Sequence, residues 1–157
     1  MATGADTSRI DATVLVVDDD DDFRAALAET LEEEGYHVVD ARTGDLALAL
    51  LDDAVKGRTR APDLLVLDLL MPRMSGIEVL QRLRKSRRWA SLPVLVITGV
   101  NDQMLPVRLD VPVAFKTDPQ IVLDAVRQQL TRRRSPTSPA TTAQDGSEDG
   151  SPRSDRQ

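Results

Sequence analysis

The sequence predicts an α/β domain in which a doubly wound, five-stranded parallel sheet is covered by helices on both faces. Two observations support this prediction. Short aliphatic runs alternate along the chain with longer stretches in which apolar residues recur at helical spacing. The runs are almost continuously apolar, which is typical of parallel strands buried on both faces. Because aromatic residues make up only 3% of the 157, the core is expected to be aliphatic.

Each element follows from its own pattern. Helices are expected where apolar residues recur at helical spacing, around 23–31, 46–51, 77–83 and 121–130. The expected strands are TVLVV at 13–17, HVVDA at 37–41, DLLVLDLL at 63–70, PVLVIT at 93–98 and PVAF at 112–115.

Composition sets the limits of the domain. The last 27 residues, 131–157, contain no Val, Ile, Leu, Met or aromatic residue, so they cannot bury enough apolar surface to fold and are expected to form a disordered tail. Residues 1–11 are expected to be flexible, which leaves one folded unit at 12–130.

The same composition excludes several function classes. The chain has no cysteine and a single histidine, which excludes thiolate metal sites and His-rich metal sites. A net charge of −6 and scarce aromatic residues argue against nucleic-acid binding. No apolar run reaches the ~18 residues that span a bilayer, and the N-terminus lacks the apolar core of a signal peptide. We therefore expect a cytoplasmic protein without membrane association.

Polar residues stand in, at the end of or directly after four of the expected strands. Asp18 and Asp19 follow the first strand, Asp68 lies in the third, Thr98 ends the fourth and Lys116 follows the fifth. The carboxyl ends of parallel strands meet at one edge of the sheet, where ligands bind in open α/β folds. These five side chains are therefore expected to surround one crevice.

The residue types in this crevice suit phosphoryl transfer. Clustered carboxylates repel one another unless a cation neutralises them, and hard oxygen ligands are those that Mg²⁺ prefers. Lys116 would supply a fixed positive charge and Thr98 a hydroxyl donor for a transferred phosphoryl group. A carboxylate can itself be the nucleophile and form an aspartyl phosphate.

Some of these residues also have ordinary structural explanations. Asp20, Asp21 and Asp22 fit the N-terminus of a solvated helix, with Asp21 or Asp22 as a cap or first-turn residue. The basic cluster between Arg82 and Arg88 fits a helix C-terminus, and Trp89 fits a cap over that helix.

Four blocks in order, VLVVDD, DLLVLDLLMPRMSG, PVLVITG and AFKTDP, strongly resemble the receiver domain of two-component response regulators. The resemblance covers roughly 12–130. It implies a flavodoxin-like (CheY-like) fold with strand order 2-1-3-4-5. It also implies that Asp68 is the phosphoacceptor and that Thr98 and Lys116 contact the phosphoryl group. The implied Mg²⁺ ligands are Asp18, Asp19, Asp68 and the backbone carbonyl of Leu70.

The chain departs from the family pattern near its fifth strand. Val113 stands three residues before Lys116, where receivers usually have an aromatic residue, and Phe115 is expected to point into the core instead. Thr117 replaces the usual Pro after the lysine, which puts a cis peptide there in doubt. Between strands four and five, Pro106 interrupts a segment with little helical periodicity, so the fourth helix is expected to be short, distorted or replaced by a loop.

The resemblance implies a single-domain response regulator. It would accept a phosphoryl group on Asp68 from a sensor histidine kinase or phosphotransfer protein, in a Mg²⁺-dependent reaction, and signal through an unknown downstream protein. It would be a signalling domain rather than an enzyme, catalysing only its own phosphorylation and dephosphorylation. A receiver-like scaffold that works without phosphorylation is the alternative. A phosphatase of the aspartyl-phosphate type would need a second carboxylate where Leu70 stands.

Overall fold

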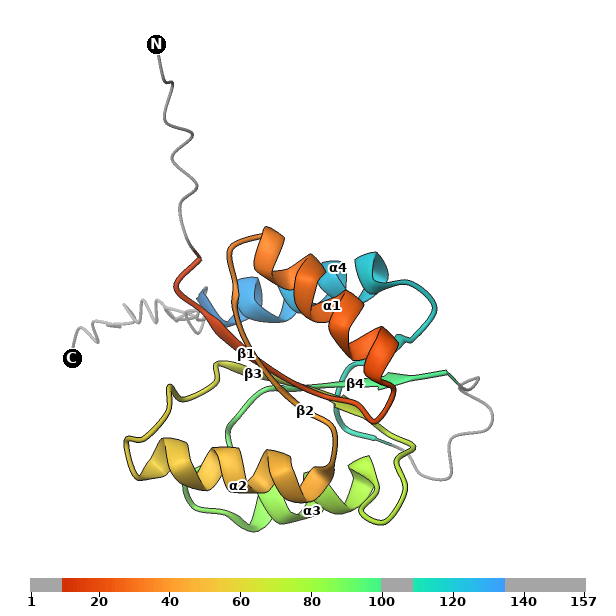
Figure 1. The fold of residues 1–157 in the computed structure, drawn as a ribbon. Coiled ribbons are helices and arrows are strands. Elements are labelled where there is room, and N and C mark those ends of the chain that lie inside the picture. Colours follow the sequence, from red (N-terminus) through yellow and green to blue (C-terminus); the bar gives the residue numbers. More distant parts are fainter. Residues whose placement is uncertain (1–9, 100–108, 135–157) are drawn as a thin grey trace, which may run out of the picture.

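The computed structural model describes residues 10–99 and 109–134. Five parallel strands form one sheet in the order β2-β1-β3-β4-β5, as expected for a flavodoxin-like domain (Figure 1). In chain order the elements are β1 (Thr13–Val17), α1 (Asp21–Glu33), β2 (His37–Ala41), α2 (Gly44–Val55), β3 (Leu64–Asp68), α3 (Gly76–Lys85), β4 (Val94–Thr98), β5 (Val113–Phe115) and α4 (Pro119–Arg134).

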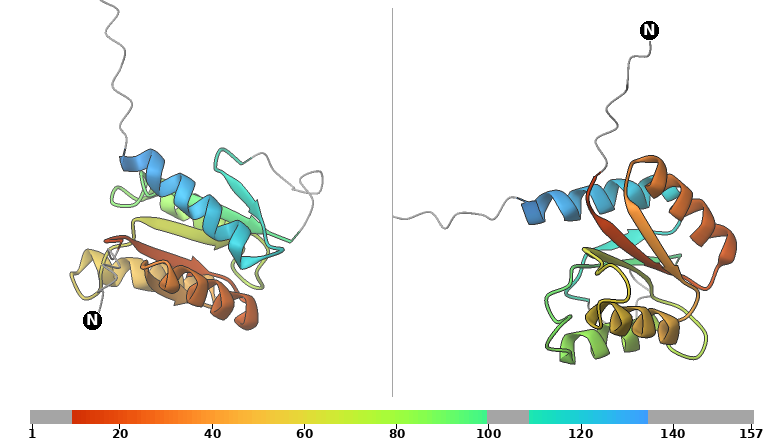
Figure 2. Two further views of the ribbon diagram at one scale, coloured as in Figure 1. Left: turned by 90° about the horizontal axis from the view of Figure 1, so that it is seen from above. Right: turned by 60° about the vertical axis from the view of Figure 1, so that its left-hand side comes forward.

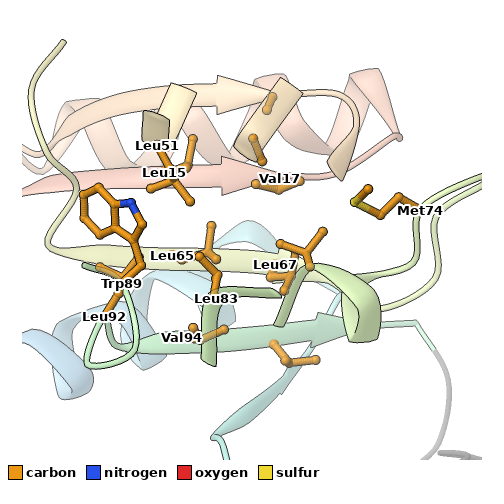
Figure 3. Close-up of a cluster of buried hydrophobic side chains, with 14 of the residues drawn as sticks. Leu15, Val17, Leu51, Leu65, Leu67, Met74, Leu83, Trp89, Leu92 and Val94 are labelled. Atoms are coloured by element: carbon orange, nitrogen blue, oxygen red, sulfur yellow. The ribbon is translucent and has the colours of Figure 1, made fainter. Parts of the chain in front are cut away.

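Two helices cover each face of the sheet, and each face has its own aliphatic cluster (Figures 1 and 2). Alternate residues of β1 divide between them: Leu15 and Val17 face α2 and α3, whereas Val14 and Val16 face α1 and α4. Figure 3 shows the first cluster, with Trp89 at one end and Met74 at the other. Burial on both faces explains the unbroken apolar runs of the three central strands.

Side-chain caps fix where the first three helices begin. Asp20 accepts a hydrogen bond from the backbone N–H of Phe23 at the start of α1, and Thr43 caps α2 in the same way. Ser75 and Glu78 form a reciprocal capping box at α3. Because these caps sit directly after the loops at the carboxyl edge of the sheet, they also fix the path of those loops.

Both predicted domain boundaries need adjustment. The final helix does not end at 130 but continues to Arg134, so residues 131–134 belong to the fold rather than to the tail. Leu130, directly before this last turn, is buried in the α1–α4 cluster. Arg133 donates a hydrogen bond to the backbone oxygen of Asp63, and basic residues favour a helix C-terminus. At the other end, Ile10 packs against the α1–α4 cluster. Asp11, also from the predicted flexible end, forms an ion pair with Arg60, and residues 1–9 and 135–157 lie outside the described residues.

The predicted orientation of Phe115 is wrong. Its side chain is 41% exposed, because the alternating pattern of β5 turns Ala114 into the α1–α4 cluster and places Phe115 at the end of an edge strand. Val113 packs against the other cluster instead. The expectation of a short or distorted fourth helix falls mainly on 100–108, outside the described residues; residues 109–112 of that connection are not helical. No peptide bond is cis in the described ranges.

Candidate phosphoacceptor and metal site

The parallel sheet brings the predicted residues together at one edge. Asp18 follows β1, Asp68 ends β3, Thr98 ends β4 and Lys116 follows β5. These four side chains are buried or nearly so. Asp19 also lies at this edge, but it is exposed to solvent. By contrast, the histidine of the chain, His37, begins β2 and lies at the opposite edge, as the sequence indicated.

Three carboxylates lie close enough to share one ion. Asp18, Asp19 and Asp68 each offer an oxygen, and these oxygens lie within 4.8 Å of one another. Oδ2 of Asp18 is buried and has no hydrogen-bond partner among the described residues. An unpaired buried carboxylate oxygen is costly unless a cation satisfies it. The donor set therefore fits a hard divalent cation such as Mg²⁺.

Lys116 is the counter-charge of this cluster. Its Nζ lies 2.8 Å from Oδ1 of Asp18 and 3.5 Å from Oδ2 of Asp68. Burial acts to lower the pKa of Lys116, but the hydrogen bond to Asp18 and the charges of both aspartates outweigh it and raise the pKa. The ammonium group also lies 5.1 Å from the centre of the Phe23 ring, which adds a cation–π contact. Lys116 is thus held as a cation within the site.

The electrostatics single out Asp68. Burial, followed by the charge of Asp18, raises the pKa of the Asp68 carboxyl to about 7, and Lys116 only partly opposes this shift. Without a metal ion, one ammonium group does not balance two ionised carboxylates in a buried site, so ionisation of both is unfavourable. A bound divalent cation would favour the ionised form of Asp68, which is the nucleophilic form.

Arg24 is the residue that sequence reasoning missed. Its side chain is only 13% exposed and donates to the backbone oxygen of Asp18 at 2.8 Å, to Asp40 at 2.7 Å and to Asp21 at 2.7 Å. It therefore ties the end of β1 to β2 and to α1. The available signal was Arg24 three residues after Asp21, a helical ion-pair spacing.

Gly76 is required by the close approach of two backbone segments. A Cβ at this position would lie 2.2 Å from the backbone oxygen of Asp68 and 2.9 Å from Cα of Leu69. Gly76 therefore lets α3 begin directly against the end of β3. Gly99 differs, since a Cβ there would meet no atom of residues 10–99 and 109–134 within 4 Å.

The remaining predicted residues also lie at this edge. Thr98 is fully buried, and its backbone oxygen accepts a hydrogen bond from the backbone N–H of Lys116 at 2.8 Å. The backbone N–H of Leu70 donates to Oδ1 of Asp68 at 3.3 Å, and its side chain is exposed. Asp20, rather than Asp21 or Asp22, caps α1, while Asp21 and Asp22 lie in the first turn. The role of the Leu70 carbonyl as a metal ligand stays a prediction.

A family model for the response regulator receiver domain matches residues 14–111, well over half of the chain. The chain belongs to this receiver family. Transcriptional regulatory protein CpxR of Klebsiella pneumoniae is 40% identical over 91 residues, which are 58% of this chain and 35% of CpxR. The transcriptional regulatory protein YrkP of Bacillus subtilis is 41% identical over 86 residues, 55% of this chain and 33% of YrkP. The receiver chain thus spans about a third of the length of these curated relatives.

Solved receiver structures share the fold. Chemotaxis protein CheY4 of Vibrio cholerae aligns with a TM-score of 0.62 at 25% identity, covering 75% of this chain and 98% of CheY4. The receiver domain of the Francisella response regulator 1452 aligns with a TM-score of 0.63 at 26% identity, covering 78% and 98% of the two chains. In the described parts of this receiver, no helix is both long enough and apolar enough to span a membrane.

Proposed function

We propose that this receiver accepts a phosphoryl group on Asp68 from a phosphohistidine of a sensor kinase or phosphotransfer protein. The observation that supports this most directly is the cluster itself: three carboxylates within 4.8 Å of one another, with the ammonium of Lys116 between Asp18 and Asp68. A structural ion pair alone would not need three carboxylates clustered at one edge of the sheet.

The Mg²⁺ ion would be held by the carboxylates of Asp18, Asp19 and Asp68 and by the backbone carbonyl of Leu70. When bound, it would neutralise negative charge on the phosphoryl oxygens. A carboxylate oxygen of Asp68 attacks phosphorus, the bond from phosphorus to the histidine nitrogen breaks, and the histidine keeps that electron pair. Lys116 and the Thr98 hydroxyl then bind phosphoryl oxygens. Water later hydrolyses the aspartyl phosphate, which resets the domain.

The proposed output is binding of a downstream protein. The alternative is a scaffold that works without phosphorylation, and one observation favours it: the partly buried Val113 stands where receivers usually carry an aromatic residue that responds to phosphorylation. The complete set of Asp18, Asp19, Asp68, Thr98 and Lys116 favours phosphoryl transfer, because a scaffold gains nothing from clustered like charges.

Intact-mass measurement tests the proposal. The chain is incubated with acetyl phosphate or phosphoramidate, with Mg²⁺ or with EDTA, beside an Asp68→Asn variant. We expect one phosphoryl adduct that requires Mg²⁺ and is missing in Asp68→Asn. A folded protein that acquires no adduct with Mg²⁺ present would favour the scaffold. An adduct on Asp68→Asn would show that another residue accepts the phosphoryl group.

A further inference from the structure

A second surface lies at the edge of the sheet opposite to Asp68. An open hollow of about 390 Å³ lies there between helices α2 and α3 and the turn at 86–91. Its apolar lining comes from Leu48, Leu51, Val55, Leu83 and Trp89. In Figure 3, Trp89 and Leu92 lie at this end of the α2–α3 cluster, whereas Met74 lies at the other. We call this hollow and its rim the Trp89 surface.

The rim of the Trp89 surface carries positive charge without matching acids. Arg82, Arg87 and Arg88 are exposed lining residues, and none of them forms an ion pair with another residue in the described ranges. The acidic lining residue, Asp52, is already paired with Lys56 at 2.5 Å. This unbalanced rim lies on a chain whose net charge is −6. The local field at this rim therefore attracts anionic groups although the chain as a whole is acidic.

The turn that forms this surface is held in place. Ser86 accepts a hydrogen bond from the N–H of Trp89 through its side chain and from Ala90 through its backbone oxygen. Arg84 donates to the backbone oxygens of Ala90 and Leu92 at 2.8 and 3.3 Å. The guanidinium of Arg88 lies 5.5 Å from the centre of the Trp89 ring. A surface ordered in this way loses less conformational entropy on binding than a flexible loop.

We propose that the Trp89 surface docks an acidic segment of a partner protein, with one aliphatic side chain seated in the hollow and carboxylates on the arginine rim. Charge complementarity and the apolar floor both support this occupant. Residues 135–157 of the chain itself contain no Val, Leu, Ile or Met, so they cannot supply the aliphatic anchor. The phosphates of a nucleic acid would contact the arginines but would leave the apolar lining without an apolar partner.

This proposal extends the proposed function by adding a second docking face, and it does not depend on phosphoryl transfer. The hollow and Asp68 lie at opposite edges of the sheet, so binding is expected to persist in unphosphorylated protein. An Asp68→Asn chain should bind with unchanged affinity, which separates a failure of this proposal from a failure of phosphorylation.

Fluorescence of Trp89 provides the test, since it is the one tryptophan of the chain. The full chain is titrated with a short Glu-rich peptide that carries one central Leu. Three further probes are the same peptide with Leu changed to Ser, the peptide with every Glu changed to Gln, and a short DNA duplex. We expect saturable binding of the first peptide and clearly weaker binding of the other two peptides.

Charge reversal assigns the binding to this surface. Arg87→Glu combined with Arg88→Glu should weaken binding of the Leu-containing acidic peptide by about tenfold or more. The matched double variant, Arg42→Glu with Arg132→Glu, changes the same charge elsewhere and should bind as the unmodified chain does. The proposal fails if the peptide does not bind, if both double variants bind equally, if the Leu is dispensable, or if DNA binds more tightly with the same arginine dependence.

Discussion

The ammonium nitrogen of Lys116 lies 2.8 Å from Oδ1 of Asp18, although 98 positions separate the two residues in the chain. Asp18 is fully buried and Lys116 retains 14% side-chain exposure, so this pair links the ends of β1 and β5 with little access to water. Because Asp68 lies 3.5 Å from the same nitrogen, one ammonium group pairs with two buried carboxylates, and the exposed Asp20 lies 3.9 Å away. In the site without a metal, Lys116 is therefore the cation that offsets the two buried carboxylates.

Removal of Lys116 should therefore destabilise the domain. Lys116→Met is expected to lower the free energy of unfolding by about 2–3 kcal/mol, because it leaves buried acids without a counter-charge. Asp18→Asn with Lys116→Met should lose less than the sum of the two single variants. Urea denaturation of all four proteins, in EDTA, measures this coupling. Additive single-variant effects would show that the pair contributes little.

Mg²⁺ should stabilise the folded chain through the three carboxylates. When its free concentration is ten times its dissociation constant, a ligand that binds only the folded state adds about 1.4 kcal/mol to the free energy of unfolding. This corresponds to a rise in melting temperature of about 5 °C. Asp19→Asn should reduce this rise, because Asp19 provides one of the three oxygens. Glu29→Gln, which removes an exposed carboxylate from α1, is the matched control. Calorimetry with Mg²⁺ and with EDTA measures the rise in melting temperature for each variant. An equal rise in Asp19→Asn and Glu29→Gln would show that the ion binds elsewhere.

Two glycines at the same edge should respond differently to substitution. Gly76→Ala is expected to cost about 2–4 kcal/mol, since the added Cβ would lie 2.2 Å from the backbone oxygen of Asp68 and only backbone movement could relieve the clash. Gly99→Ala should change stability by about 0.5 kcal/mol or less, because no atom of the described residues lies within 4 Å of its Cβ position. Equal effects in urea denaturation would contradict the close packing of α3 on β3.

Arg24 should matter more than a neighbouring arginine that contacts the same acid. Arg24→Gln is expected to cost about 2 kcal/mol, because it removes charge-assisted hydrogen bonds from a side chain that is 13% exposed. Arg42 is 67% exposed and lies 4.0 Å from Asp21, so Arg42→Gln should stay within about 0.5 kcal/mol. Mg²⁺ titration of both variants shows whether Arg24 also positions the turn at Asp18. Unchanged metal affinity in Arg24→Gln would limit it to a structural role.

The raised pKa of Asp68 predicts how metal-free stability depends on pH. The unfolded carboxyl releases its proton near pH 3.8, whereas the folded one keeps it up to about pH 7. The folded state therefore binds more protons across this window, and Asp68 reduces stability as the pH rises through it. Asp68→Asn should have nearly the stability of the unmodified chain at pH 4 and exceed it by roughly 2–4 kcal/mol at pH 8 in EDTA. A difference that does not vary with pH would contradict the shift.

The sequence alone determined the sheet and most of the site. Continuous apolar runs predicted five buried strands, and the polar residues that end them identified Asp18, Asp68, Thr98 and Lys116. This worked because a parallel sheet places every strand's carboxyl end at one edge, so a one-dimensional pattern fixes a three-dimensional neighbourhood. The helices were predicted only approximately, because their apolar spacing marks the buried turns but not the first residue, and the cap of α1 is Asp20 rather than Asp21 or Asp22.

Only the tertiary structure showed the features that depend on contacts between segments far apart in the sequence. Arg24 became part of the site only when β1, β2 and α1 were placed together, and the requirement for Gly76 appeared only when α3 approached the end of β3. The exposure of Phe115 followed from the position of β5 at the sheet edge, which the sequence of a three-residue strand does not encode. The helical residues 131–134 are stabilised at Arg133 by the backbone oxygen of Asp63, which lies 70 positions away. Local composition determines which segments can be buried, but only packing determines which of them meet.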